Sequence, residues 1–241
     1  MSVKTPFSKQ QLDTYLKELG KEFRRLTKRK SEAELILVGG AAILINYTFR
    51  DATTDADAII LGASAMDDVI RNVGNKFELL PGWLNTDFSK TASYTPKLRE
   101  YSKPYRTFSN VLHVRTVADE YLVAMKLMAG RQYKHDLSDI VGILWEHEKN
   151  GAPLHRTQLD SAINTLYENK PLPDITRQLL DDIFNHGDLQ SAYSELQKQE
   201  EEARDILRIF ESEYPNTLTA DTIDNVLEQM KKRKANSHGE M

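Results

Sequence analysis

The chain has 241 residues, of which 40% are hydrophobic and 28% are charged, and its formal net charge at pH 7 is −4. This length allows one large domain, or one domain with an appendage, and the composition is typical of a globular protein. The sequence contains no cysteine, which excludes disulfides, thiolate metal sites and cysteine nucleophiles. The acidic balance makes the whole molecule a poor electrostatic partner for nucleic acid and leaves only local basic clusters for that role.

No targeting or membrane-spanning segment is evident. The first thirty residues lack the apolar core of a secretory signal, and no stretch approaches eighteen consecutive apolar residues. The absence of cysteine agrees with a reducing compartment. We therefore expect a cytoplasmic protein that does not enter the membrane.

The first half of the sequence mixes helix and strand patterns. Ser8 and Gln11 form a capping-box pattern, and apolar residues recur at helical spacing from there to about residue 28. Short apolar runs predict strands at 34–38, 54–61 and 111–115. Helical periodicity predicts further helices at 41–47, 64–77, 118–131 and 136–149. Residues 78–110 are expected to be irregular around short strands.

The segment 150–153, Asn-Gly-Ala-Pro, is the clearest boundary in the sequence, because these residues favour turns. Every later segment has a helical pattern, which predicts helices at 156–168, 174–185, 188–213 and 219–233. The polar tail from Lys231 is expected to fray. We therefore predict an α+β fold with a small sheet flanked by helices in residues 1–150, followed by an all-helical region in residues 151–241.

Two short motifs suggest chemistry. Gly39 and Gly40 end a predicted strand and open a helix, which lets backbone N–H groups approach an anion; the alternative is a tight turn that needs glycine for its conformation. Asp55 and Asp57 alternate in a predicted strand, so both carboxylates face the same side, roughly 6–7 Å apart. Such a pair suits Mg²⁺, and the alternative is a solvated polar face on an edge strand.

Lys126 is the only charged residue between Tyr121 and Gly130. In so apolar a helix, it either covers apolar surface with its stem or points into a cleft, where it could pair with triphosphate oxygens. Asp136 and Asp139 follow at helical spacing, where the simplest interpretation is a favourable position at a helix N-terminus.

In chain order, these motifs resemble those of the minimal nucleotidyltransferases of the polymerase-beta-like superfamily. The motifs are Val38-Gly39-Gly40, Arg50, Asp55-Ala56-Asp57, Trp83-Leu84-Asn85 and Lys126 through Asp136-x-x-Asp139. The chain is most similar to the bacterial group of abortive-infection-type nucleotidyltransferase toxins, over about residues 10–150. The resemblance implies a small mixed sheet and Mg²⁺- or Mn²⁺-dependent transfer of NMP from an NTP to an acceptor hydroxyl, in a toxin–antitoxin or phage-defence setting.

The resemblance also implies roles for matching residues. Asp55 and Asp57 would hold the metal and act in catalysis. The other catalytic residues would be Lys126, which contacts phosphate, and Asp136. The nucleotide would be bound by Gly39, Gly40, Arg50, Lys126 and Arg131. The chain departs from the family where many members carry a third carboxylate, because the strand at 111–115 offers His113; Asp87 or Asp136 could substitute.

Partners and alternatives remain open at this point. Basic stretches at 21–30 and 97–106 are typical of solvated surfaces or of RNA-binding surfaces, and the resemblance favours RNA, especially a tRNA 3′ end, as the acceptor. The charge run at 198–204 predicts a solvated helix with one packed face, or a surface for a cognate protein. The main alternative function is a nucleotidyltransferase scaffold without turnover, acting as a binding or antitoxin-like protein.

Overall fold

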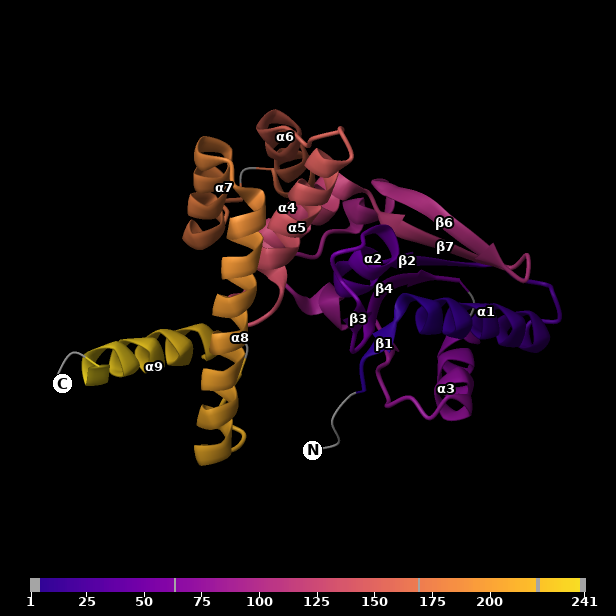
Figure 1. Ribbon diagram of the computed structural model, residues 1–241. Helices are drawn as coiled ribbons and strands as arrows, with labels where there is room; N and C mark the ends of the chain where they lie inside the picture. The colour runs from indigo at the N-terminus through magenta and orange to yellow at the C-terminus, as the bar shows by residue number, and fades with distance from the viewer. Residues whose placement is uncertain (1–4, 63, 169, 220–221, 239–241) are drawn as a thin grey trace. The chain divides into compact units, whose positions relative to one another are not determined.

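The computed structural model describes residues 5–62, 64–168, 170–219 and 222–238, and it confirms the predicted α+β class (Figure 1). The chain forms two compact units, each described here by itself. The sheet unit comprises Met1–Met125 and Glu146–Pro171, and the helical unit comprises Lys126–Trp145 and Leu172–Met241. Two helices, α4 (Asp119–Ala129) and α5 (Asp136–Lys149), contribute residues to both units.

The sheet unit is built on a mixed sheet of five strands in the order β5-β4-β2-β7-β6. Its central strand β2 pairs in parallel with β7 and antiparallel with β4. The strands are β2 (Ala33–Leu37), β4 (Ala56–Leu61), β5 (Leu84–Asn85), β6 (Ser102–Phe108) and β7 (Leu112–Val117). The carboxyl ends of β2 and β7 and the start of β4 therefore lie side by side, at the same end of the sheet's strands.

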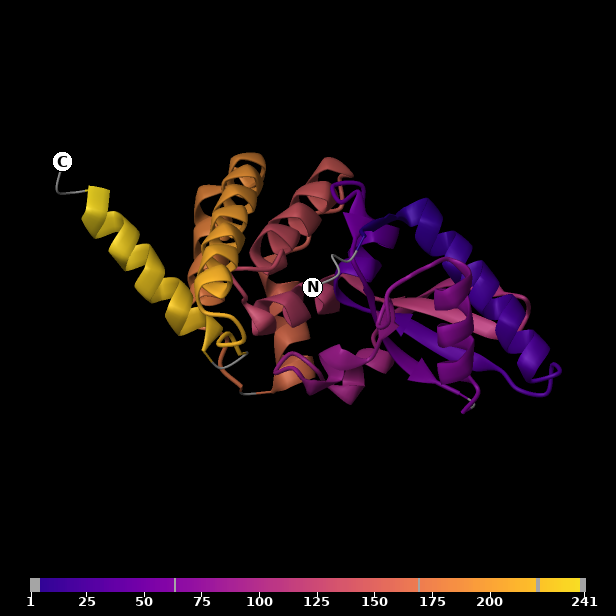
Figure 2. The same cartoon turned by 90° about the horizontal axis from the view of Figure 1, so that it is seen from below.

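Two helices, α1 (Lys9–Leu26) and α3 (Met66–Lys76), lie side by side over one face of this sheet (Figure 2). The predicted capping box is confirmed, because Ser8 and Gln11 exchange side-chain and backbone hydrogen bonds at the start of α1. One apolar side of α1 is buried against alternate sheet residues. Side chains that recur every 3.6 residues on the helix and every second residue on the strands therefore form a common core. The residues of α1 in this core include Leu12, Leu16, Leu19 and Phe23.

A separate two-stranded ladder joins β1 (Phe7–Ser8) to β3 (Ala52–Thr53). It explains one correction to the sequence interpretation: β4 begins at Ala56, so Asp55 precedes the strand that was predicted to include it. Because Thr53 is held in the ladder with Phe7, the chain bends at Thr54 before it enters β4.

The other predicted helices are also present. In the sheet unit these are α2 (Gly39–Asn46) and α6 (Arg156–Tyr167), and short 3₁₀ turns occupy Asp87–Lys90 and Pro96–Arg99. The helical unit contains α7 (Asp174–His186), α8 (Leu189–Glu213) and α9 (Ile223–His238), and α8 packs on α9 through Ala203, Leu207 and Leu227.

Residues 78–110 hold short strands within irregular structure as expected, and the longer of these strands, β6, covers 102–108. One further expectation was wrong: α9 continues beyond Lys231 to His238 instead of fraying there, and residues 239–241 lie outside the described residues. Among the described helices, none combines the length and apolar character needed to cross a bilayer.

Candidate functional site

The turn between β2 and α2 requires glycine at two positions for different reasons. Gly39 has a left-handed backbone with φ of +54°, which residues with a side chain rarely adopt. A Cβ at Gly40 would lie 3.0 Å from the Thr53 hydroxyl oxygen and 3.4 Å from the Arg50 guanidinium carbon. A side chain at Gly40 would therefore be tight against the Thr53 hydroxyl and would occupy the space next to the Arg50 cation.

This turn opens α2 without a side-chain cap among the described residues. The N-cap residue is Val38, whose side chain cannot accept a hydrogen bond, so the first N–H groups of the helix keep their capacity to bind an anion. Gly39 and Gly40 are both partly exposed. Together with the nearby Arg50 guanidinium, the turn has the polarity that binding of a phosphate group requires.

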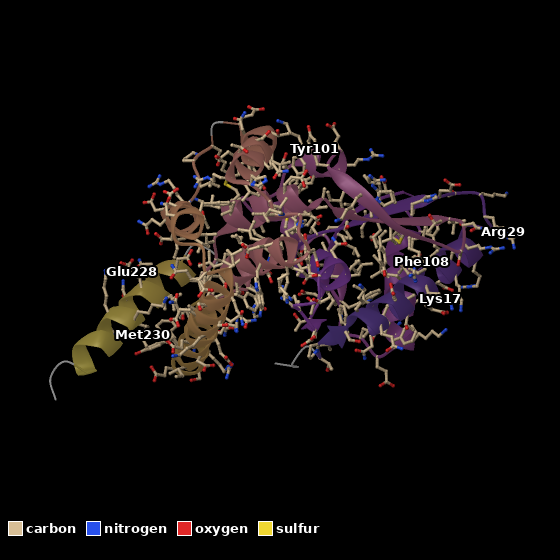
Figure 3. The ribbon with its side chains drawn as sticks, turned by 45° about the horizontal axis from the view of Figure 1, so that its top comes forward. Lys17, Arg29, Tyr101, Phe108, Glu228 and Met230 are labelled. Carbon is tan, nitrogen blue, oxygen red and sulfur yellow. The ribbon has the colours of Figure 1, made fainter. Side chains whose placement is uncertain are left out.

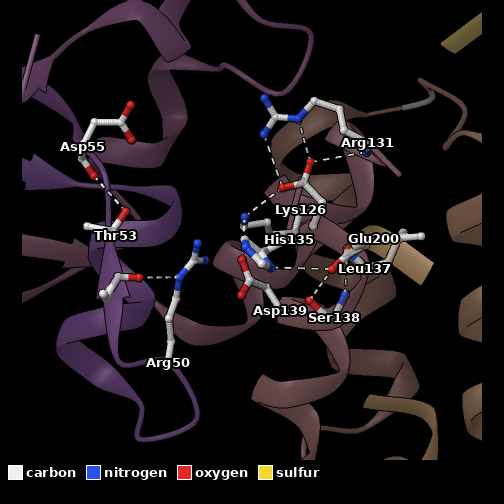
Figure 4. Close-up of polar contacts among 12 residues, drawn as sticks. Arg50, Thr53, Asp55, Lys126, Arg131, His135, Leu137, Ser138, Asp139 and Glu200 are labelled. Carbon is white, nitrogen blue, oxygen red and sulfur yellow. Dashed lines mark hydrogen bonds and ion pairs between the residues drawn. The ribbon is translucent and has the colours of Figure 1, made fainter. Parts of the chain in front are cut away.

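The carboxylate of Asp57 faces this turn from the neighbouring strand. Its backbone oxygen accepts a 2.9 Å hydrogen bond from the Val38 N–H, and its Oδ2 lies 3.8 Å from where a Cβ on Gly39 would be. Asp55 lies in the preceding bend, where its backbone oxygen accepts a 3.0 Å hydrogen bond from the Thr53 hydroxyl (Figure 4). Both aspartates are half-buried, so their carboxylates can reach a cation at the surface.

The structure thus brings four of the predicted residues of the sheet unit together at the carboxyl end of β2: Gly39, Gly40, Arg50 and Asp57. Asp55 lies in the adjoining bend. Thr53 joins this group and was missed from the sequence. Its importance depends on the β1–β3 ladder, a pairing between Phe7 and Thr53 across 46 positions that no local pattern reveals.

The end of β7, the strand on which the resemblance led us to look for a third carboxylate, is occupied by Thr116 and Val117. The Thr116 hydroxyl exchanges hydrogen bonds with the side chain of Asn46 at the end of α2. His113 lies at the other end of the strand, where it contacts Glu32 and Thr107. Asp87, a candidate substitute, forms an exposed ion pair with Lys90.

The helical unit contains the other predicted residues, and there Lys126 forms a buried ion-pair network. Its ammonium nitrogen lies 2.8 Å from Asp136 Oδ1 and 2.8 Å from Asp139 Oδ2. Arg131 adds a 2.7 Å contact from its Nε to Asp136 Oδ2 (Figure 4). Lys126, Asp136 and Asp139 are 5%, 0% and 3% exposed, so these charges are removed from water and must neutralise one another.

This network fixes the start of α5 against the end of α4. Burial opposes ionisation of Asp136, but Lys126 and Arg131 outweigh it and hold the pKa of this carboxyl below its usual range. The sequence left two arrangements open for Lys126, a stem on apolar surface or a cleft cation. The structure shows a buried lysine between two carboxylates, so its ammonium group is already bound by protein oxygens.

Glu200 was not singled out, although it belongs to the charge run on α8. Its carboxylate accepts hydrogen bonds from the backbone N–H groups of Leu137 and Ser138 at 3.0 and 3.2 Å, and from the Ser138 hydroxyl at 2.6 Å (Figure 4). Glu200 is 1% exposed, and this burial raises its pKa to about 7. A signal was present in the sequence, because Glu200, Ala203 and Leu207 share one helix face.

A comparison with protein families identifies the class. The model of a family described as a nucleotidyltransferase of unknown function (DUF6036) matches residues 14–147, which is more than half of the chain. The chain therefore belongs to this family, and the match includes the glycine turn, Asp55, Asp57 and the Lys126 network. Comparisons with curated proteins and with solved structures find no match for the chain.

Proposed function

We propose that the protein transfers NMP from a nucleoside triphosphate to an acceptor hydroxyl, and that its active site is the glycine turn at the carboxyl end of β2. The observation that carries this proposal is the position of the Asp57 carboxylate opposite a glycine turn that also adjoins Arg50. An anion-binding turn and a cation-binding carboxylate are thus adjacent, as a metal–triphosphate substrate requires. Membership of a nucleotidyltransferase family supports the same reaction class.

In this proposal, the α2 N-terminus and Arg50 bind and orient the triphosphate. Asp57 and Asp55 would hold Mg²⁺ or Mn²⁺, because carboxylate oxygens are the hard ligands that these ions prefer. The bound ion would supply stabilisation of negative charge on the phosphate oxygens. The acceptor hydroxyl oxygen then attacks the α-phosphorus and loses its proton to solvent, and pyrophosphate leaves with the electron pair of the bond that breaks.

The residues of the helical unit have a supporting part in this proposal. The resemblance implied that Lys126 and Arg131 contact the nucleotide and that Asp136 completes the site. Because Lys126 is bound by Asp136 and Asp139, we propose that it acts by fixing the start of α5.

The decisive experiment compares Asp57→Ala with Asp51→Ala, which removes an exposed carboxylate just outside the site. Each protein is incubated with Mg²⁺, labelled NTPs and total cellular RNA or protein. Loss of a metal ligand should cost several kcal/mol of transition-state stabilisation, so Asp57→Ala should lower label transfer about a hundredfold or more, and Asp51→Ala should leave it unchanged. Thermal unfolding of both variants should stay close to that of the wild type.

The destination of the label distinguishes the open alternatives. Label in RNA supports an RNA acceptor such as a tRNA 3′ end, and label in protein supports a nucleotidylated protein. Calorimetric binding of an NTP with Mg²⁺ but no transfer would support the scaffold alternative. No binding of any NTP by the folded protein would refute the proposed site. The toxin setting is part of the same proposal, and it predicts that expression of the wild type, but not of Asp57→Ala, arrests growth.

A further inference from the structure

An open hollow of about 420 Å³ lies at the C-terminal end of α1 and is lined almost entirely by cations. The lining residues are Lys21, Arg24, Arg25, Lys28, Arg29 and Ser109. Between residues 17 and 30 the chain has seven Lys or Arg residues and two Glu residues, although the whole chain has a net charge of −4. We call this surface the basic hollow. Its charge is opposite in sign to that of the molecule as a whole.

The charge of the basic hollow is not cancelled by neighbouring carboxylates. Lys21 and Arg25 contact Glu18 and Glu22, but Arg24, Lys28 and Arg29 have no ion-pair partner in the described part of the chain. Arg29 projects from the turn that follows α1 (Figure 3). The hollow therefore retains cations whose donors are available to a bound anion.

The second basic stretch of the sequence behaves differently. Lys97 contacts Glu168, Arg99 contacts Glu34, and Lys103 contacts Asp119, while Arg106 lies 3.8 Å from Asp13. Each of these cations thus has a carboxylate neighbour, and the stretch at 97–106 is largely neutralised within the protein. The structure selects the basic hollow as the stronger anion-binding surface of the two.

The backbone at the hollow supports a role for its side chains. Helix α1 ends in a Schellman motif, in which the Arg29 N–H bonds the Arg24 carbonyl and the Lys28 N–H bonds the Arg25 carbonyl. The left-handed position of this motif usually holds glycine, yet here Lys28 has φ of 52° and Arg29 has φ of 64°. Two cationic side chains are therefore kept where glycine would relieve backbone strain, as is typical of positions that serve binding.

The basic hollow and the proposed active site lie at opposite ends of α1. The helix begins next to the β1–β3 ladder, whose Thr53 adjoins Gly40, and it ends at the hollow (Figure 1). Eighteen helical residues at about 1.5 Å each span about 27 Å. In a double-helical strand, phosphates follow one another at about 3.4 Å along the axis, so this span corresponds to roughly eight nucleotides.

From this arrangement we infer that the basic hollow binds the phosphodiester backbone of a nucleic-acid acceptor whose reactive end reaches the glycine turn. The inference rests on the proposed function for the reaction itself, but binding to the hollow does not require turnover. A single nucleotide could not span both places.

The test measures binding of fluorescently labelled RNA hairpins, single-stranded RNA and DNA of the same sequence, in the absence of NTP. The triple variant Arg24→Gln, Lys28→Gln and Arg29→Gln is compared with a control of equal charge, Arg177→Gln, Arg208→Gln and Lys232→Gln, from exposed surface of the helical unit. The hollow variant should weaken binding at least tenfold. It should also reduce the slope of log Kd against log salt by about two, at about 0.7 for each lost single-strand contact.

The control variant should change affinity less than twofold, and equal losses in both variants would overturn the inference. Comparison of RNA with DNA identifies the type of backbone, and binding only to vesicles that contain phosphatidylserine would also overturn it. A second variant, Lys28→Gly with Arg29→Gly, separates binding from folding. It should weaken binding while the melting temperature stays the same or rises, and a lower melting temperature would contradict the role assigned to these left-handed residues.

The inference and the proposed function can fail separately. Binding of nucleic acid through the hollow without label transfer would leave the inference standing and remove the reaction. Label transfer to another acceptor, with no nucleic-acid binding at the hollow, would leave the proposed reaction standing and remove the inference.

Discussion

Replacing Glu200 with Gln should abolish most of the pH dependence of stability in the helical unit between pH 4.5 and 7. The folded pKa of Glu200 is raised to about 7 from an ordinary value of 4.5, chiefly by burial. In this window the folded protein therefore binds more protons than the unfolded chain, and its stability falls as the pH rises. The stability that the neutral Glu200 carboxyl contributes to the folded state is fully present below about pH 4.5 and is lost above about pH 7.

The expected size follows from the same values. A pKa difference of about 2.5 corresponds to roughly 3 kcal/mol, which is a large part of the stability of a typical domain. Gln cannot ionise, and its carbonyl oxygen can still accept the N–H groups of Leu137 and Ser138. The stability of Glu200→Gln relative to the wild type should therefore rise by roughly 3 kcal/mol between pH 4.5 and 7.5.

Urea unfolding at a series of pH values provides the assay. Trp145 lies on α5 with its ring 5.7 Å from that of Tyr193 on α8, so its fluorescence reports this packing. The chain has two tryptophans, and Trp83→Phe removes the signal of the other one. His135, whose Nδ1 is 3.7 Å from Glu200 Oε2, is a second ionisable side chain next to this carboxylate, so His135→Gln is the control. Equal pH slopes in the wild type and in Glu200→Gln would refute the reasoning.

Two further substitutions test packing and buried charge. Gly20→Ala should lower stability by about 1–2 kcal/mol despite the better helix propensity of alanine, because the new Cβ would lie 2.7 Å from Phe108 Cβ and 3.1 Å from its backbone oxygen; a higher urea midpoint would contradict this. Lys126→Met should cost about 3–5 kcal/mol, because it removes a buried counter-ion from Asp136 and Asp139. Adding Asp139→Asn should restore part of that loss, and an unchanged midpoint for Lys126→Met would show that the network contributes nothing.

The helices were predictable because their signals are local. The Ser8–Gln11 capping box, the Asn150–Pro153 turn and the glycine at 187 each lie within a few residues of the boundary that they mark. The left-handed cap at Gly187, with φ of 69°, separates α7 from α8 as the pattern indicated. Such features depend on backbone geometry that neighbouring residues determine.

Strand β6 was harder to recognise because it lies at the edge of the sheet. Among the described strands it pairs only with β7, its exposed residues are Pro104, Arg106 and Thr107, and the ladder shifts register between Pro104 and Arg106. Proline is tolerated at edges and bulges but weakens the sequence signal of a strand. The polar composition of residues 102–108 therefore concealed an ordinary edge strand.

The candidate site was predictable in part. The glycine pair and Asp57 were recognised because their chemistry and their spacing lie in one short segment. Contacts over long sequence separations were not, and Glu200 with Ser138 is an example across 62 positions. The charge of Glu200 is evident in the sequence but its burial is not, and burial decides whether a carboxylate stays solvated or anchors a helix.

The β1–β3 ladder has a practical consequence for handling the protein. Phe7 is paired with Thr53, and the Thr53 hydroxyl lies against Gly40. The N-terminal segment therefore supports one wall of the proposed active site. A truncation or a tightly fused tag that displaces Phe7 would release that wall. The resulting loss of activity would look like a chemical defect, although no group that touches the substrate had been altered.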